Sequence, residues 1–277
     1  MSGAKAHSVE ISPRRGWSSL GLAEVWEFRE LLFFLIWREV KGRYRQMALG
    51  PLWIILKPLV TMVILSVIFG RVAKMPSDGL PYPLFTYSGL LPWTLFAVAT
   101  GKATTSLVTN LNVISKVYFP RLVVPIAAAA SGLVDFFMSF LILLGMVFFY
   151  GLTPSPNIIY LPAFLLLGLA TALALGLCLA TLAVKFRDVG YGVEHMLQVM
   201  IYLTPVVYPS SMLSGTWRTL YLLNPMAVVI EGFRWSLLGH GQPPGLATLG
   251  VAAGVLVLLL VGAMLFRRSE RTVVDLM

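Results

Sequence analysis

Three ionisable residues lie inside long apolar stretches of this sequence, where a charged group needs a physical explanation. They are Lys57, Lys102 and Asp135. A bare carboxylate in hydrocarbon is unfavourable, and pairing with a cation or contact with a wet cavity is the usual remedy. We therefore predict that Asp135 pairs with Lys57 or Lys102, or faces a polar path. The alternative for the lysines is that their long stems carry the ammonium groups to the membrane surface.

The other residues that could do chemistry form no nucleotide or metal site. Gly101-Lys102-Ala103-Thr104 comes nearest to a phosphate-binding loop, but Phe96 stands where the motif G-x-x-x-x-G-K-[ST] requires its first glycine. The single cysteine, Cys178, excludes disulfides within the chain. The three histidines, His7, His195 and His240, are too scattered to converge on a metal. We predict no catalytic residue, no metal and no cofactor bound by this chain.

Membrane helices are the elements expected to position these residues. The chain has 277 residues, of which 58% are hydrophobic and 12% charged. These values lie outside the range of soluble domains. Crossing a bilayer takes about 20 mainly apolar residues. Six stretches qualify, at 50–71, 83–107, 122–150, 157–184, 192–209 and 246–266. We predict an all-α integral membrane protein with a six-span transmembrane domain over residues 50–266.

The basic residues predict how the chain is oriented. Its formal net charge is +9, and Arg38, Lys41, Arg43 and Arg45 come shortly before the first apolar stretch. Lys and Arg near a span hold their segment on the cytoplasmic side. With six spans, both termini are then cytoplasmic. We expect the anionic lipids of the inner leaflet, rather than nucleic acid, to balance this charge.

The segments before the first predicted span and after the last one are predicted to lie outside the membrane core. Residues 1–20 are predicted to be a disordered cytoplasmic tail without a cleavable signal peptide. Residues 21–49 predict an amphipathic interface helix, since Glu24, Glu27 and Glu30 recur at helical spacing beside apolar residues such as Phe33 and Phe34. The alternative is a first membrane span, which the carboxylates disfavour. Residues 267–277 are predicted to be a second cytoplasmic tail.

Two short loops on the predicted inner side are charged and aromatic. One runs from Asn110 to Pro125, with its apolar side chains expected to be exposed, and the other from Lys185 to Gly192. Since the chain has no ATP site, an ATP-driven protein would need such surfaces to dock a separate ATPase. The candidate docking residues are Asn110, Lys116, Val117, Tyr118, Phe119, Arg187 and Asp188. The alternative is that these charges and rings only mark the membrane interface.

Residues 210–240, between the last two predicted spans, indicate an outer gate built from two re-entrant half-helices. The pair Asn224-Pro225 interrupts an otherwise apolar stretch and disfavours a continuous helix. Short helices are tolerated at membrane depth where protein buries them or where they line a wet cavity. Glu231 and Arg234 lie three residues apart and are expected to pair on one helix face. The alternative is an interfacial helix on the outer surface.

Seven ordered pieces of the chain resemble the membrane subunit of bacterial polysaccharide ABC exporters. They are RxxKxRYRQxxLGPLWxxLKPL at 38–59, YPLFTYSGLLPW at 82–93, NVISKVYFPR at 112–121, FRDV at 186–189, TPVVYP at 204–209, LNPMAVVIEGFRW at 223–235 and FRRSERTVVDLM at 266–277. The similarity covers nearly the whole chain. It is greatest to the subgroup that exports lipopolysaccharide O-antigen, with teichoic acid and capsule exporters as neighbouring subgroups.

The resemblance implies a homodimer in the bacterial inner membrane with two copies of a cytoplasmic ATPase, which would hold ATP and Mg. A lipid-linked polysaccharide would then cross in a channel between the two membrane subunits. The interface helix of such families contacts the ATPase, which adds Glu24 and Glu27 to the docking candidates.

Aromatic side chains with polar tips suit the wall of a sugar channel, because they offer flat apolar faces and a few hydrogen-bonding groups. The channel-lining candidates are Trp53, Phe69, Tyr87, Trp93, Phe96, Tyr202 and Tyr208. The alternative is that these rings simply gather at the two membrane interfaces, as in any membrane protein.

Other function classes fit less well. An ion-driven transporter should show repeated halves and an acidic relay, and Asp135 is the only acid deep in a predicted span. A membrane glycosyltransferase needs clustered carboxylates, but Asp188 and Glu194 have no second cluster near them in the sequence. An exporter of teichoic acid, capsule or another lipid-linked substrate is the nearest alternative.

Overall fold

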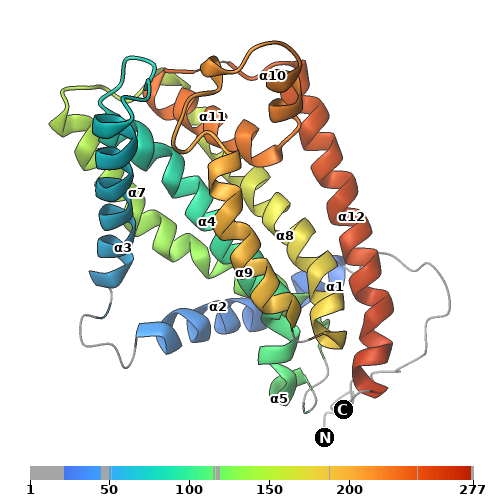
Figure 1. The fold of residues 1–277 in the computed structure, drawn as a ribbon. Helices are drawn as coiled ribbons and strands as arrows, with labels where there is room; N and C mark the ends of the chain where they lie inside the picture. The colour runs from blue at the N-terminus through green and yellow to red at the C-terminus, as the bar shows by residue number, and fades with distance from the viewer. Residues whose placement is uncertain are drawn as a thin grey trace, which may run out of the picture.

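The computed structural model describes residues 22–44, 50, 52–114, 116, 119–186, 188–241 and 243–275. The predictions for residues 1–20 and for Val117, Tyr118 and Arg187 fall outside this part of the chain. Within it, the regular structure is helical (Figure 1). The α-helices are α1 Leu22–Glu27, α2 Arg29–Tyr44, α3 Leu52–Leu65, α4 Tyr82–Thr109, α5 Leu111–Ile114, α6 Val123–Ala130, α7 Gly132–Phe149, α8 Leu161–Lys185, α9 Asp188–Met200, α10 Gly215–Leu222, α11 Pro225–Leu238 and α12 Leu246–Asp275.

Four helical stretches of the described chain are long and apolar enough to cross a membrane. They are Leu52–Val72, Val123–Phe149, Pro156–Lys185 and Leu246–Arg268. Helices suit a bilayer because every backbone hydrogen bond is made within the segment. These stretches correspond to the first, third, fourth and sixth predicted spans. The last helix, α12, continues to Asp275, so most of the predicted tail at 267–277 extends this helix.

The second predicted span is α4, a helix of 28 residues at the centre of the fold. It packs against α3, α6, α7, α8 and α11, and its side chains between Leu84 and Leu107 are mostly buried. Small residues allow α4 and α8 to approach closely: a Cβ atom on Gly176 would lie 2.5 Å from the Cβ of Ala103. Close backbone approach at small residues is a common way for membrane helices to pack.

The fifth predicted span, 192–209, is not one continuous helix. The helix α9 has 13 residues and ends at Met200. A short 3-10 turn at Ile201–Leu203 follows, and Thr204 then adopts an extended backbone. Pro205 and Pro209 explain the break, because proline lacks the backbone N–H that a continuing helix needs.

The region between the last two predicted spans contains two helices, α10 and α11, divided at Asn224-Pro225 as predicted, and their re-entrant placement stays a prediction. Asn224 caps α11, accepting a hydrogen bond from the backbone N–H of Met226 at 3.0 Å, and Pro225 occupies the first helical position. This arrangement satisfies one of the free N–H groups at the helix start. Gly239, with φ of +70°, ends the helix.

The region predicted to be an interface helix is helical over residues 22–44, as the two helices α1 and α2, and its place at a membrane interface stays a prediction. Figure 1 shows α2 lying crosswise at one end of the bundle, the end at which α12 also finishes, with α10 and α11 at the opposite end. We name these the α2 end and the α11 end. The apolar residues of α2 do not form a single buried face: Leu35 is buried in a cluster with Phe119, Leu122 and Phe266, whereas Phe33 and Phe34 are exposed. Exposed rings beside charged residues suit a helix at a membrane interface.

Candidate functional site

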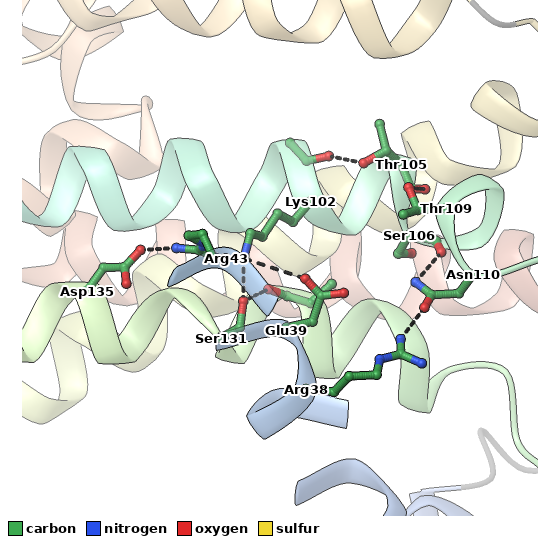
Figure 2. Close-up of polar contacts among 12 residues, drawn as sticks. Arg38, Glu39, Arg43, Lys102, Thr105, Ser106, Thr109, Asn110, Ser131 and Asp135 are labelled. Atoms are coloured by element: carbon green, nitrogen blue, oxygen red, sulfur yellow. Dashed lines mark hydrogen bonds and ion pairs between the residues drawn. The ribbon is translucent and has the colours of Figure 1, made fainter. Parts of the chain in front are cut away.

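A group of charged and polar side chains joins α2 to the bundle at the α2 end (Figure 2). Arg38, Glu39 and Arg43 come from α2. Lys102 comes from α4, and Asn110 caps the end of that helix. Ser131 and Asp135 come from the region where α6 meets α7. This group is called the clamp cluster.

Asp135 forms an ion pair with Arg43 of α2. The prediction that Asp135 pairs with Lys57 or Lys102 was therefore wrong as to its partner. The reason is the position of α2, which brings the end of the basic run against the first turn of α7. Each of the two side chains is 23% exposed. Because both charges are largely removed from solvent, removing one of the two side chains should cost more than it would at an ordinary surface pair.

Lys102 takes part in a second connection to α2. Its ammonium group donates a hydrogen bond to Ser131 Oγ at 2.6 Å and lies 3.9 Å from Glu39 Oε2. Ser131 stands between α6 and α7, and its hydroxyl donates in turn to the carbonyl of Ala128 at 2.8 Å. One lysine thus connects α2, α4 and the junction of α6 with α7.

Asn110 completes the clamp cluster where α4 ends. Its side-chain oxygen accepts a hydrogen bond from Arg38, and its amide group donates to the carbonyl of Ser106 at 2.9 Å. The residue is 8% exposed. Asn110 was predicted to dock a partner, but within this chain its side chain holds α2 against α4.

A further ion pair ties the beginning of the interface region to α12. Glu24 Oε2 lies 3.6 Å from a guanidinium nitrogen of Arg267. Glu24 is the more exposed member of the pair. The two helices of the interface region are therefore fixed to the bundle at several points, on α4, α7 and α12.

Among the remaining docking candidates that the structure describes, one side chain is buried and three are exposed. Phe119 was expected to be exposed, yet it is 5% exposed and packs with Leu35, because the chain turns inward there before α6. Glu27, Lys116 and Asp188 are exposed, at or near the α2 end. These three side chains remain available for a partner.

The channel-lining candidates divide into two groups. Tyr87, Trp93 and Phe96 are buried, at 0%, 4% and 1% exposure, because α4 is surrounded by other helices. Within one copy of the chain they face neighbouring helices, and their place in a channel between two copies stays a prediction. Trp53 and Tyr202 are about half exposed, and Phe69 and Tyr208 are partly buried. The Tyr208 hydroxyl donates to the carbonyl of Tyr202 at 2.9 Å.

Arg234 of α11 is buried and forms hydrogen bonds to two other segments of the chain at the α11 end. Its side chain is 3% exposed and donates hydrogen bonds to the carbonyls of Phe85 at 3.1 Å and Pro205 at 2.9 Å. It also donates to Ser88 Oγ at 3.3 Å. These bonds replace the expected pairing with Glu231 as its main contacts. They hold α11, α4 and the extended segment after α9 together.

Sequence reasoning treated Arg43 only as an orientation signal and did not consider Glu39 or Ser131 as site residues. A local signal existed, because Glu39 and Arg43 are four residues apart and so share a face of α2. Their partners on α4 and α7 could not be identified without the fold.

The fold and the clamp cluster define an integral membrane protein in which charged groups fix α1 and α2 to one end of the apolar bundle. A family profile described as ABC-2 type transporter matches residues 30–238. The chain therefore belongs to the ABC-2 type transporter membrane family.

Several relatives of known name share much of the chain. The O-antigen export system permease protein RfbA of Myxococcus xanthus is 32% identical over 251 residues, covering 89% of this chain and 96% of the relative. A protein of the same name in Klebsiella pneumoniae is 28% identical and covers 74% of this chain and 79% of its own length. The polysialic acid transport protein KpsM of Escherichia coli is 22% identical and covers 85% and 92%. The relatives are named for transport rather than for catalysis.

Proposed function

We propose that this chain is the membrane subunit of an ATP-driven exporter that moves a lipid-linked, O-antigen-like polysaccharide from the cytoplasmic side across the bacterial inner membrane. The observation that carries the proposal is the clamp cluster, which fixes the interface helices to α4 and α7. A partner that pushes on α2 would thereby move the membrane helices themselves. The names of the relatives, which concern O-antigen and polysialic acid, support a polysaccharide as the cargo.

The proposed topology has six crossings and both termini in the cytoplasm, with the α2 end facing inward. The four apolar stretches supply four crossings. The helix α4, at about 1.5 Å per residue over 28 residues, is about 42 Å long and reaches across the hydrocarbon layer. The fifth crossing would combine α9 with the segment that follows it up to Pro209. From Thr204 onward this segment is mostly buried in protein, as suits irregular backbone in a membrane. The helices α10 and α11 would then form the re-entrant outer gate.

ATP and Mg belong, in this proposal, to a separate cytoplasmic ATPase present in two copies. The exposed side chains Glu27, Lys116 and Asp188 offer it charged contacts. Glu24 would act with Arg267, since the two already form an ion pair. The polymer would pass between two copies of this chain, where the exposed Trp53 and Tyr202 offer aromatic surface. Anionic lipids would surround the basic inner side.

The experiment that tests the function is to delete the gene and compare polysaccharide on the cell surface with lipid-linked polysaccharide retained inside. We expect loss from the surface together with accumulation inside, restored by the wild-type gene. Purification of the tagged chain from its own host should also yield an ATPase subunit. A normal surface polymer in the deletion strain, with no internal accumulation, would refute polysaccharide export.

A further inference from the structure

The first apolar stretch changes its helical form as it approaches the α11 end of the bundle. The helix α3 ends at Leu65, and a π-helix over Ser66–Val72 continues the stretch. In a π-helix the backbone hydrogen bonds join residues five apart, whereas in an α-helix they join residues four apart. The N–H of Ala73 donates to the carbonyl of Ile68 at 2.9 Å, which shows this wider turn. Such turns are rare and are frequently found at functional sites.

Two features indicate that the π-helical form stores local strain. Lys74, which follows it, has φ of +51°, a left-handed backbone that is unfavourable for a residue with a β carbon. The Ser66 hydroxyl is buried and has no hydrogen-bond partner within the part of the chain that the structure describes. A buried polar group of this kind is one sign of stored strain. Contacts with the rest of the protein must therefore hold the segment in this form.

One close contact joins the π-helix to α4. Gly70 lies against the ring of Tyr82, the first residue of α4, and a Cβ atom on Gly70 would lie 2.7 Å from the ring carbons. None of the seven residues of the π-helix is buried, so packing elsewhere holds it only weakly. If the stretch continued as an α-helix, the residues after the change would turn by one position, or about 100°. The contact between Gly70 and Tyr82 would then be lost.

Tyr82 connects this contact to the α11 end. Its hydroxyl donates a hydrogen bond to the carbonyl of Val207 at 2.5 Å, in the segment after α9. Arg234 of α11 donates to the same segment. The loop after the π-helix has a second connection, because Asp78 accepts a hydrogen bond from Ser211 at 2.8 Å, shortly before α10. A change in helical form would therefore reach both α10 and α11.

We propose that Ser66–Val72 is a conformational switch, which changes between the π-helix and a continuous α-helix. In the α-helical form Val72 turns by about 100° about the helix axis and Gly70 leaves Tyr82. The loop at 73–81 takes up the residue that is released, since most of its residues are exposed. The strained backbone of Lys74 can relax in that form. The switch concerns the shape of the first apolar stretch and does not depend on what the protein transports.

The experiment measures the distance between two nitroxide labels by pulsed electron paramagnetic resonance. The full-length chain carries Cys178→Ser, with labels at Val72→Cys and Ile159→Cys, two exposed positions. Unlabelled chain is co-expressed in excess, so that only distances within one copy are measured in nanodiscs. A side chain about 5–6 Å from the helix axis moves by up to about 8 Å in a turn of about 100°. We expect two distances in the otherwise unchanged chain.

Two variants should change the balance in opposite directions. Gly70→Ala places a β carbon against the Tyr82 ring and should increase the share of the second distance. Gly145→Ala on α7 is the matched control, because nothing lies within 4 Å of its added carbon. Deletion of Val67 removes one residue from the wide turn, so that an α-helix brings Gly70 to Tyr82. This variant should show the first distance alone.

A single distance that is the same in the unchanged chain and in Gly70→Ala would overturn the switch. Two distances in unchanged proportions after deletion of Val67 would also overturn it. If Gly70→Ala fails to fold, the comparison between the unchanged chain and the Val67 deletion still decides the matter.

The use of the switch in transport rests on the proposed function. In the gene-deletion strain, a gene copy without the Val67 codon should leave the polysaccharide inside the cell, although the chain reaches the membrane in the wild-type amount. Full restoration of surface polysaccharide by this copy would overturn the role of the switch in transport. Failure of the export proposal itself is distinguishable, because the deletion strain would then show normal surface polysaccharide without any added gene.

Discussion

Breaking the ion pair between Arg43 and Asp135 should loosen α2 from the bundle. Two unit charges about 4 Å apart interact by about 4 kcal/mol at an effective dielectric constant of about 20. Desolvation offsets part of this, and side chains that are 23% exposed lie between the surface and buried limits. We expect Asp135→Asn to cost about 2 kcal/mol, which is about a thirtyfold change in the equilibrium between docked and released α2.

Hydrogen exchange of the backbone amides of α2 measures this equilibrium directly, because local opening of a helix raises the exchange rate. Rates in α2 should rise about thirtyfold in Asp135→Asn, while those in α8 stay unchanged. Lys41→Ala is the matched control, since it removes an exposed cation from the same turn region of α2. Exchange in α2 that is the same in the wild type and in Asp135→Asn would refute the reasoning.

A double-mutant cycle distinguishes pairing from a general loss of charge. Arg43→Gln alone leaves the carboxylate of Asp135 largely buried without this partner, and should loosen α2 at least as much as Asp135→Asn does. In the double variant the two neutral side chains can still hydrogen-bond. Its effect should therefore be smaller than the sum of the single effects by about 1 kcal/mol. Additive effects would show that the two residues act independently.

Three further predictions concern the packing of the bundle and the α11 end. Gly176→Leu should prevent stable folding, because even a Cβ at this position would lie 2.5 Å from that of Ala103. Gly101→Ala on the facing helix has open space and should be tolerated, as yield and elution profile after purification will show. Arg234→Met should cost about 3 kcal/mol, read as a lower unfolding temperature in detergent, because buried carbonyl groups lose their donor. Asn224→Ala should cost about 1 kcal/mol in the same assay, because α11 loses its N-terminal cap.

Apolar runs and helix breakers were the features that sequence predicted best. Length and hydropathy located the four apolar stretches within a few residues, because crossing a bilayer demands them. Asn224-Pro225 located the division between α10 and α11, since proline fixes the first turn of a helix. The helical spacing of Glu24, Glu27 and Glu30 predicted the helical region of α1 and α2.

Side-chain direction was the feature that sequence predicted least well. Tyr87, Trp93 and Phe96 were assigned to a channel wall because of their type, yet all three are buried against neighbouring helices of the same chain. The partner of Asp135 was sought within the spans, whereas it came from α2, a helix outside them. Both results have one cause: local periodicity does not determine which neighbour covers a given face.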